Sequence, residues 1–154
     1  MAGRSVRLLE PGQTPHARLP QRTGSVHSLA FITAHSLPGL ILATGGADGA
    51  IRLWDPQEPR QEALPVLHGH RGKVTALTTL HHPAHTQPLL ISASTDDTTV
   101  RIWECQTGEE VLRLVTAAPI TSLVVLPPEA SPQDSPPTIV FGSPRGIGAA
   151  TVHL

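Results

Sequence analysis

An internal repeat is the feature of this sequence that most limits what the chain can fold into. Residues 24–31 align with residues 72–79, and residues 50–55 (AIRLWD) align with residues 99–104 (TVRIWE). The two alignments correspond to shifts of 48 and 49 residues. Self-similarity at a period of this length is typical of proteins built from stacked supersecondary units, each of which buries its apolar face against its neighbours. We therefore expect a row of similar units instead of one irregular core.

Each unit is predicted to contain three strands and a weaker fourth. In residues 51–54 and again in 100–103, aliphatic side chains alternate with Arg and Trp, which is the period of a β-strand. Turn residues precede both stretches, and we expect the second turn to hold one extra residue at Asp97 and Thr98. No window carries a helical apolar stripe, so the chain is predicted to be all-β. The weaker fourth strands are expected at residues 62–67 and 110–115.

A third copy of the unit is detectable but degenerate. Its three strands are expected within residues 118–126, 138–143 and 150–154, and its tryptophan position would follow Leu154. A proline-rich loop at 127–137 separates the first two of these strands. The predicted divisions of the chain are an N-terminal segment with a possible outer strand (1–23), a first repeat (24–68), a second repeat (69–115) and a degenerate, truncated third repeat (116–154).

Composition narrows the class of protein. Charged residues make up 15% of the 154 residues and the formal net charge is −1, so the chain has no basic field that would indicate a nucleic-acid partner. No apolar stretch is long enough to span a membrane. The single cysteine, Cys105, cannot form an internal disulfide, which fits a reducing compartment. We expect an intracellular protein of the cytoplasm, the nucleus or both.

The second unit closely resembles the WD-repeat family of β-propellers. It carries Gly69-His70, then Ser92-Ala93-Ser94, then Asp96 in the turn and a strand that ends on Trp103-Glu104. The first unit ends on a literal Trp54-Asp55 pair. This resemblance implies four-stranded antiparallel blades, and the sequence would supply an arc of about 2.5–3 of them. Such a partial propeller is not a closed ring by itself.

The resemblance also implies a structural tetrad of hydrogen-bonded side chains. A buried indole N–H or imidazole without a partner costs about 1–3 kcal/mol, and a linked chain of side chains satisfies both groups together. In the first unit Arg22 stands at the histidine position, so only a partial set is expected there. The tetrad implied for the second unit is His70, Ser92, Asp96 and Trp103, and the partial set of the first is Thr44, Asp48 and Trp54.

His70, Ser92 and Asp96 are also the residue types of a Ser-His-Asp hydrolase. That chemistry needs an exposed nucleophile beside an oxyanion hole, whereas the repeat assigns each of these residues a structural place. We therefore favour the structural interpretation and keep the hydrolase as the alternative. The glycine-rich stretch at 45–49 lacks the spacing of a phosphate-binding loop and is interpreted as a turn.

Two smaller groups of residues have a structural and a functional interpretation. His81, His82 and His85 are the only plausible metal cluster, but their loop contains proline and no nearby Cys or carboxylate, which favours a solvated loop. Arg52 and Arg101 lie on the tryptophan face of their strands, where we expect ion pairs or stacking. We expect no catalytic residues, no metal and no cofactor.

The function that the resemblance implies is a non-catalytic scaffold for protein–protein interaction. Rigid repeated sheets that present many loops suit the docking of other proteins. We expect a WD-repeat subunit of a larger complex, and a fragment or short isoform of a longer propeller protein. A regulatory short form of a longer WD-repeat protein is an alternative beside the hydrolase. An open arc exposes apolar faces and strand edges, so another copy or another chain is a further candidate for completing the ring.

Overall fold

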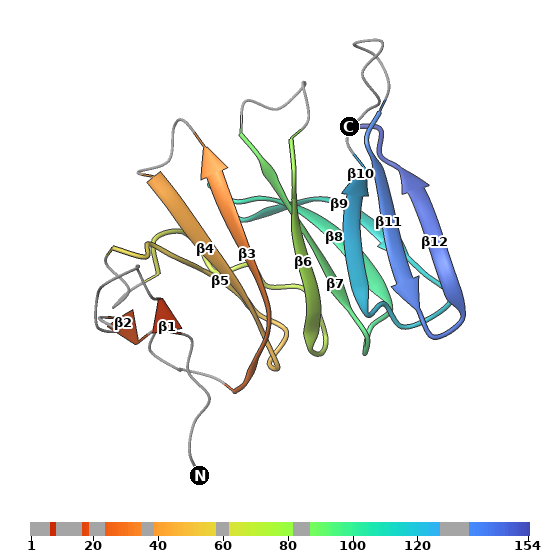
Figure 1. Ribbon diagram of the computed structural model, residues 1–154, viewed down its shortest axis with the longest axis horizontal. Coiled ribbons are helices and arrows are strands. Elements are labelled where there is room, and N and C mark those ends of the chain that lie inside the picture. The colour runs from red at the N-terminus through yellow and green to blue at the C-terminus, as the bar shows by residue number, and fades with distance from the viewer. Residues whose placement is uncertain are drawn as a thin grey trace.

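The computed structural model describes residues 7–8, 17–18, 24–34, 39–57, 62–81, 87–126 and 136–154. In these ranges the regular structure is entirely β, as predicted (Figure 1). None of the described residues forms a helix long and apolar enough to cross a membrane.

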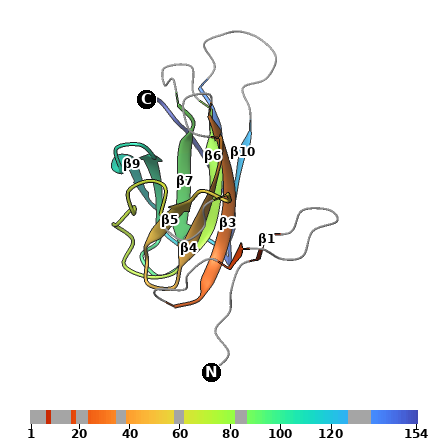
Figure 2. The same cartoon turned by 90° about the vertical axis from the view of Figure 1, so that its left-hand side faces the viewer.

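Three antiparallel sheets, called blades 1 to 3 here, stand side by side along the chain (Figures 1 and 2). Each blade follows the order of its strands in the sequence, so every connection inside a blade is a hairpin. Blade 1 contains β3 (Val26–Ala34), β4 (Gly39–Gly46) and β5 (Ile51–Trp54). Blade 2 contains β6 (Val74–Leu80), β7 (Leu89–Ser94), β8 (Thr99–Glu104) and β9 (Glu109–Val115). Blade 3 contains β10 (Ser122–Leu126), β11 (Thr138–Ser143) and β12 (Gly146–Thr151).

The predicted fourth strand is complete in blade 2 but not in blade 1. Blade 2 has a full outer strand, β9, at the predicted place. In blade 1 the corresponding segment makes two isolated bridges, in which Leu67 pairs with Ile51 and Glu62 pairs with Trp54. From the predicted N-terminal outer strand the structure describes only β2 (Ala17–Arg18), which pairs with β1 (Arg7–Leu8). The rest of that segment, and most of the proline-rich loop, lie outside the described residues.

The third strand of blade 3 begins earlier than predicted. We expected it at residues 150–154, but β12 starts at Gly146, whose φ of 123° allows a tight turn after Ser143. Ala150 therefore pairs with Ile139, as Trp103 pairs with Leu90 in blade 2. The tryptophan position of the third unit is thus occupied by alanine and does not lie beyond the last residue.

Among the described residues, the core consists of two apolar layers, one between each pair of neighbouring blades. In both layers a blade buries its tryptophan face, the face that carries Trp103 in blade 2, against the opposite face of the blade before it. The layer between blades 1 and 2 contains Ile32, Ile41, Ile51, Leu53, Leu90 and Trp103. The layer between blades 2 and 3 contains Leu80, Leu89, Ile91, Ile102, Ile120 and Ile139. Burial on both faces explains why β7 is buried along its whole length.

The turns before β5 and β8 show where the extra residue lies. Gly49 and Thr98 both have positive φ, at 81° and 55°, and each follows an aspartate whose carboxylate accepts the N–H two residues on. Asp97 therefore corresponds to Asp48. The extra residue lies before Asp97, between β7 and this aspartate, and not at Asp97 and Thr98 as predicted.

This equivalence yields a matched pair of substitutions. Thr98 is β-branched and adopts a left-handed conformation, which costs about 1–2 kcal/mol in an L-residue, so Thr98→Gly is expected to raise the free energy of unfolding by up to about 1 kcal/mol. Gly49→Ala should lower it, because the new Cβ would lie 2.4 Å from the carbonyl oxygen of His70. Urea denaturation of both variants measures the two effects. A destabilised Thr98→Gly variant would contradict the assignment of strain to this turn.

Candidate functional site

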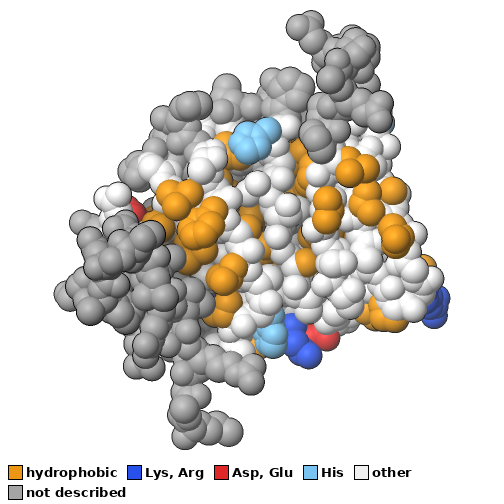
Figure 3. All heavy atoms as spheres, viewed as in Figure 1, with side chains coloured by type: hydrophobic (Ala, Val, Ile, Leu, Met, Phe, Trp, Pro, Cys, Tyr) orange, Lys and Arg blue, Asp and Glu red, His pale blue; other side chains and the backbone are white. Residues whose placement is uncertain are grey.

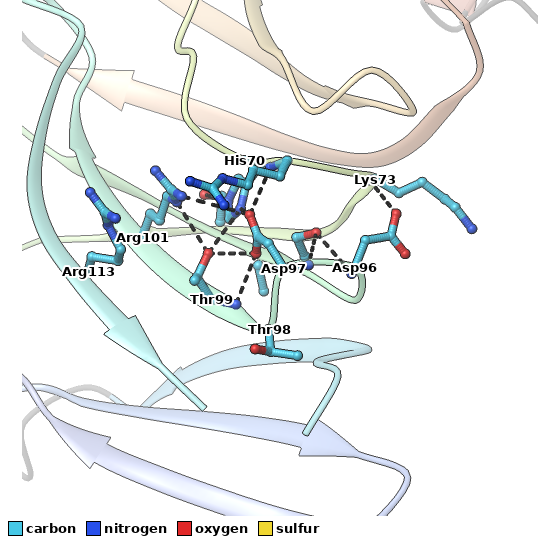
Figure 4. A network of polar contacts seen from close by, with 12 residues as sticks. His70, Lys73, Asp96, Asp97, Thr98, Thr99, Arg101 and Arg113 are labelled. Carbon is cyan, nitrogen blue, oxygen red and sulfur yellow. Dashed lines mark hydrogen bonds and ion pairs between the residues drawn. The ribbon is translucent and has the colours of Figure 1, made fainter. Parts of the chain in front are cut away.

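A chain of polar side chains runs through the interior of blade 2, beside the apolar layer it shares with blade 1 (Figure 4). The indole Nε1–H of Trp103 donates to Ser92 Oγ at 2.7 Å, and the same oxygen lies 2.7 Å from His70 Nε2. Ser92 is fully buried and the His70 side chain has no exposed surface. The structure therefore brings together three of the four residues named from the sequence.

The fourth member is Asp97, not the predicted Asp96. Asp97 Oδ2 lies 2.9 Å from His70 Nδ1 and accepts the backbone N–H of Arg71, while Oδ1 accepts the hydroxyl of Thr99. Asp96 is exposed and accepts the backbone N–H of Lys73 (Figure 4). The prediction counted forward from β7, where the extra residue intervenes. Counting back from Trp103, as from Trp54 to Asp48, identifies the correct aspartate.

The direction of each hydrogen bond follows from the chemistry of the groups. An indole N–H only donates, so Ser92 Oγ accepts from Trp103 and its own hydrogen is available to His70 Nε2. An ionised carboxylate only accepts, so Nδ1 carries the imidazole proton toward Asp97. With His70 neutral, the resulting chain from Trp103 to Asp97 leaves none of its donors unpaired.

The protonation states in the network agree with this direction. Burial lowers the pKa of His70, although the Asp97 carboxylate beside it acts in the opposite direction. Burial alone would raise the pKa of Asp97, but hydrogen bonds from Thr99, the Arg71 backbone and His70 outweigh it and bring the pKa to about 2. At neutral pH the network therefore holds a neutral imidazole against an ionised carboxylate.

A second, charged layer connects the network to the outer strand. Buried Arg101 donates to Thr99 from Nε and to Glu110 from Nη1, the latter at 2.6 Å, and its guanidinium lies 6.0 Å from the centre of the Trp103 ring. Glu110 also accepts from Arg113. For Glu110, the effect of burial on the pKa is outweighed by these two arginines, so its pKa is lowered. Arg101 was expected in an ion pair, but sequence analysis missed Glu110.

Blade 1 contains a shorter version of the same arrangement. Trp54 Nε1 donates to Thr44 Oγ1 at 2.9 Å, and Arg52 forms an ion pair with Asp48 at 2.8 Å. Arg52 also lies 4.0 Å from Glu62, which corresponds to the Arg101–Glu110 pair. In both units a Glu in the outer-strand segment follows the Arg of the third strand, ten residues later in the first unit and nine in the second, and this was the available signal for Glu110. Arg22, assigned to the histidine position here, lies outside the described residues.

The contacts of His70 have the connectivity of a Ser-His-Asp triad, with Ser92 on Nε2 and Asp97 on Nδ1. A nucleophile must reach its substrate, however, and Ser92 Oγ is buried between an indole and an imidazole. The arrangement is therefore suited to holding strands together and not to attacking a carbonyl. Among the described residues, no three His, Cys, Asp or Glu side chains group as a metal site requires. His82 and His85 lie outside those residues.

The two neighbouring aspartates can be separated by substitution. Asp97→Asn is expected to lower the free energy of unfolding by about 1–3 kcal/mol, because it weakens acceptors for His70 and Thr99 that are shielded from water. Asp96→Asn is the matched control and should have a smaller effect, since its carboxylate is exposed. Chemical denaturation of both variants measures the difference. A larger loss at Asp96 would contradict the assignment of Asp97 to the network.

The lowered pKa of His70 predicts a pH dependence of stability. Because the unfolded chain binds this proton at a higher pH than the folded chain, the free energy of unfolding should fall as the pH drops below about 6.5. A second fall is expected below pH 3.8, the ordinary pKa of aspartate, as the pH approaches the value of about 2 for Asp97. Urea denaturation between pH 8 and pH 5 tests the first step. In a His70→Gln variant the slope over that range should be smaller, and an unchanged slope would exclude His70 as its source.

Comparison with known proteins agrees with the geometry of the blades. The family described as WD domain, G-beta repeat matches residues 13–55 and 61–104. Human Coronin-7 is 36% identical over 118 residues, which cover 71% of this chain and 12% of Coronin-7. The nuclear distribution protein PAC1 of Komagataella phaffii is 31% identical over 101 residues, covering 60% of this chain and 19% of PAC1. The chain thus spans less than a fifth of either relative.

Solved structures show the same fold. The WD40 β-propeller domain of Doa1 superposes with a TM-score of 0.71 at 19% identity, over 97% of this chain and 44% of that domain. A chain in the mitotic checkpoint complex superposes with a TM-score of 0.65 at 23% identity, over 90% of this chain and 39% of its own length. With two matched repeats, blades of the same fold and a Trp–Ser–His–Asp network in the second blade, this chain belongs to the WD-repeat family of β-propeller proteins.

Proposed function

We propose that the chain is a non-catalytic scaffold for protein–protein interaction and a subunit of a larger complex. The family model that matches this chain is that of the WD domain, G-beta repeat, and proteins of the WD-repeat family generally act as interaction scaffolds. The main observation in its support is that the turns at one end of the blades combine a fixed backbone with exposed charged side chains.

The segment 70–73, before β6, shows this combination most clearly. The backbone N–H of Arg71 donates to Asp97 and that of Lys73 donates to Asp96, so both residues are held from the adjoining turn. Their side chains are exposed, and Lys73 extends away from the network (Figure 4). Cations presented from an ordered backbone lose less entropy when a partner binds, which favours recognition of an acidic partner surface. Arg145 in the blade 3 turn is exposed as well.

We also propose that further blades complete the propeller. A propeller surface is complete only when further blades cover both ends of the arc, and these could come from additional residues of a longer protein or from another chain. The free, buried Cys105 fits a reducing compartment, and we propose a location in the cytoplasm, the nucleus or both.

Charge reversal in segment 70–73 tests the proposed docking. The double variant Arg71→Glu, Lys73→Glu should keep the stability of the wild type, because these two residues contact the network through their backbone N–H groups. It should lose at least tenfold in affinity for partners identified by chemical crosslinking of the wild type in cells. Glu109→Lys, an exposed reversal on β9, is the control and should retain binding. Retained binding by the double variant would exclude segment 70–73 as the docking surface, and loss of binding by both would indicate non-specific charge effects.

A further inference from the structure

The outer strand of blade 2, β9, is an edge strand. Among the described residues it pairs with β8 alone, so its other side has no partner strand there. Figure 2 shows β9 on the side of the molecule opposite the first strands β3, β6 and β10, and apolar side chains lie over the first-strand side in Figure 3. The blades stack face to face, so blades added at either end of the row would leave the edge of β9 open.

The pattern of hydrogen bonds determines which backbone groups of β9 face outward. The N–H of Thr116, just after β9, donates to the carbonyl of Thr98. In an antiparallel pair every second residue bonds to the partner strand, so Leu114 faces β8 in the same way as Thr116. The N–H and C=O groups of Arg113 and Val115 therefore point away from β8, toward the open edge.

The equivalent pair of blade 1 agrees with this assignment. There Ile51 and Leu67 exchange both of their backbone hydrogen bonds. Ile51 and Val100 each lie three residues before the tryptophan of their strand, and Val100 pairs with Leu114. Leu114 is thus the counterpart of Leu67 and bonds to β8, which leaves its two neighbours facing outward.

The exposed side chains of this edge are largely apolar. Val111, Leu112 and Val115 are 36%, 39% and 70% exposed. Edge strands are usually protected from pairing by lysine, proline, a bulge or a short length. β9 contains neither lysine nor proline, and its register shift lies between Glu110 and Leu112, so residues 112–115 run in continuous register with β8. This stretch is therefore suited to pairing with another strand.

Arg113 places a positive charge in the middle of the stretch. Its side chain is 53% exposed, and its Nε donates to Glu110. Glu110 is shared with Arg101, which contacts it at 2.6 Å. Among the described residues no acceptor contacts the Nη groups of Arg113, so these donors are available to a second carboxylate.

We propose that the open edge of β9 binds an extended segment of a partner protein as a fifth, antiparallel strand of blade 2. The backbone of the segment pairs with Arg113 and Val115, the mode of recognition known as β-augmentation. The residue opposite Arg113 is acidic, and those opposite Val115, Leu114 and Leu112 are apolar. Along the antiparallel partner this gives the pattern apolar-apolar-acidic-apolar.

A second copy of β9 fits this edge less well than such a partner. Antiparallel pairing of two β9 strands about an axis at Arg113 or Leu114 would place Arg113 opposite Arg113 or Val115, with no acid to meet it. The site is also separate from segment 70–73, which precedes the first strand of blade 2. The proposal rests on the proposed function in that both have the chain bind other proteins, but either site can fail without the other.

A designed peptide tests the site before any partner is known. The peptide GSTVVEVTSG carries the pattern at its centre, and GSTVVKVTSG reverses the charge. NMR-detected amide hydrogen exchange of the chain measures pairing. At saturating acidic peptide, exchange of the Arg113 and Val115 N–H groups should slow by about tenfold or more, because both gain acceptors. Exchange at Leu114 should change less, and the lysine peptide should bind about tenfold more weakly.

Substitutions on the edge separate strand pairing from charge attraction. Val115→Pro removes one outward N–H and keeps the bonds to β8, since proline is tolerated on edge strands, and it should weaken binding of the acidic peptide about tenfold. Arg113→Glu should lose the acidic peptide and bind the lysine peptide instead. The double variant Arg71→Glu, Lys73→Glu is the control and should bind the acidic peptide as the wild type does. Thermal melting of each variant verifies that the fold is retained.

Four outcomes would overturn the proposal. One is no binding of the acidic peptide at about 1 mM, and another is binding without slower exchange at Arg113 and Val115. Loss of binding in the control double variant would assign the peptide to segment 70–73 instead. Slower exchange at the same two N–H groups that rises with the concentration of the chain alone would identify a second copy as the occupant of the edge.

Discussion

The hydrogen bond from the Trp103 indole to Ser92 is the contact on which the rest of blade 2 depends. A large aromatic side chain buried against blade 1 contributes much apolar contact, but it also buries an N–H that must find an acceptor. Ser92 accepts it, and the hydroxyl hydrogen that remains engages His70, which in turn engages Asp97. One indole thus ties β8 to β7, to the segment before β6 and to the turn between β7 and β8.

The three blades differ in how much of this hydrogen-bond network they contain. Blade 1 keeps the Trp54–Thr44 bond and the Arg52 ion pairs. Blade 3 has neither tryptophan nor the polar chain, because Ala150 and Phe141 stand at the tryptophan and serine positions. There the ring of Phe141 lies over Gly148, so closely that a Cβ at that glycine would be 2.4 Å from the ring. An apolar contact replaces the network where no indole N–H has to be satisfied.

Much of the site was readable from residue types at repeated spacings, and the errors have specific physical causes. The order Gly69-His70, Ser92 and Trp103 pointed to residues that do meet. Asp96 was selected instead of Asp97 because an insertion before the turn shifts the count from β7, while the count back from Trp103 is unaffected. The early start of β12 was missed because a two-residue turn at Pro144 and Arg145 replaces the longer turns of the other blades. Turn length is a local choice that a repeat alignment does not see.

The sequence by itself determined the kind of unit, the number of recognisable copies and the residues that must be satisfied when buried. Strand alternation and turn residues act over a few positions, so they are legible without coordinates. Only the tertiary structure decided which aspartate faces His70, that Glu110 completes the Arg101 layer, and which apolar residues remain uncovered on blades 1 and 3. These properties depend on register between strands and on the presence of a neighbouring blade, and both are set by packing between residues far apart in the chain.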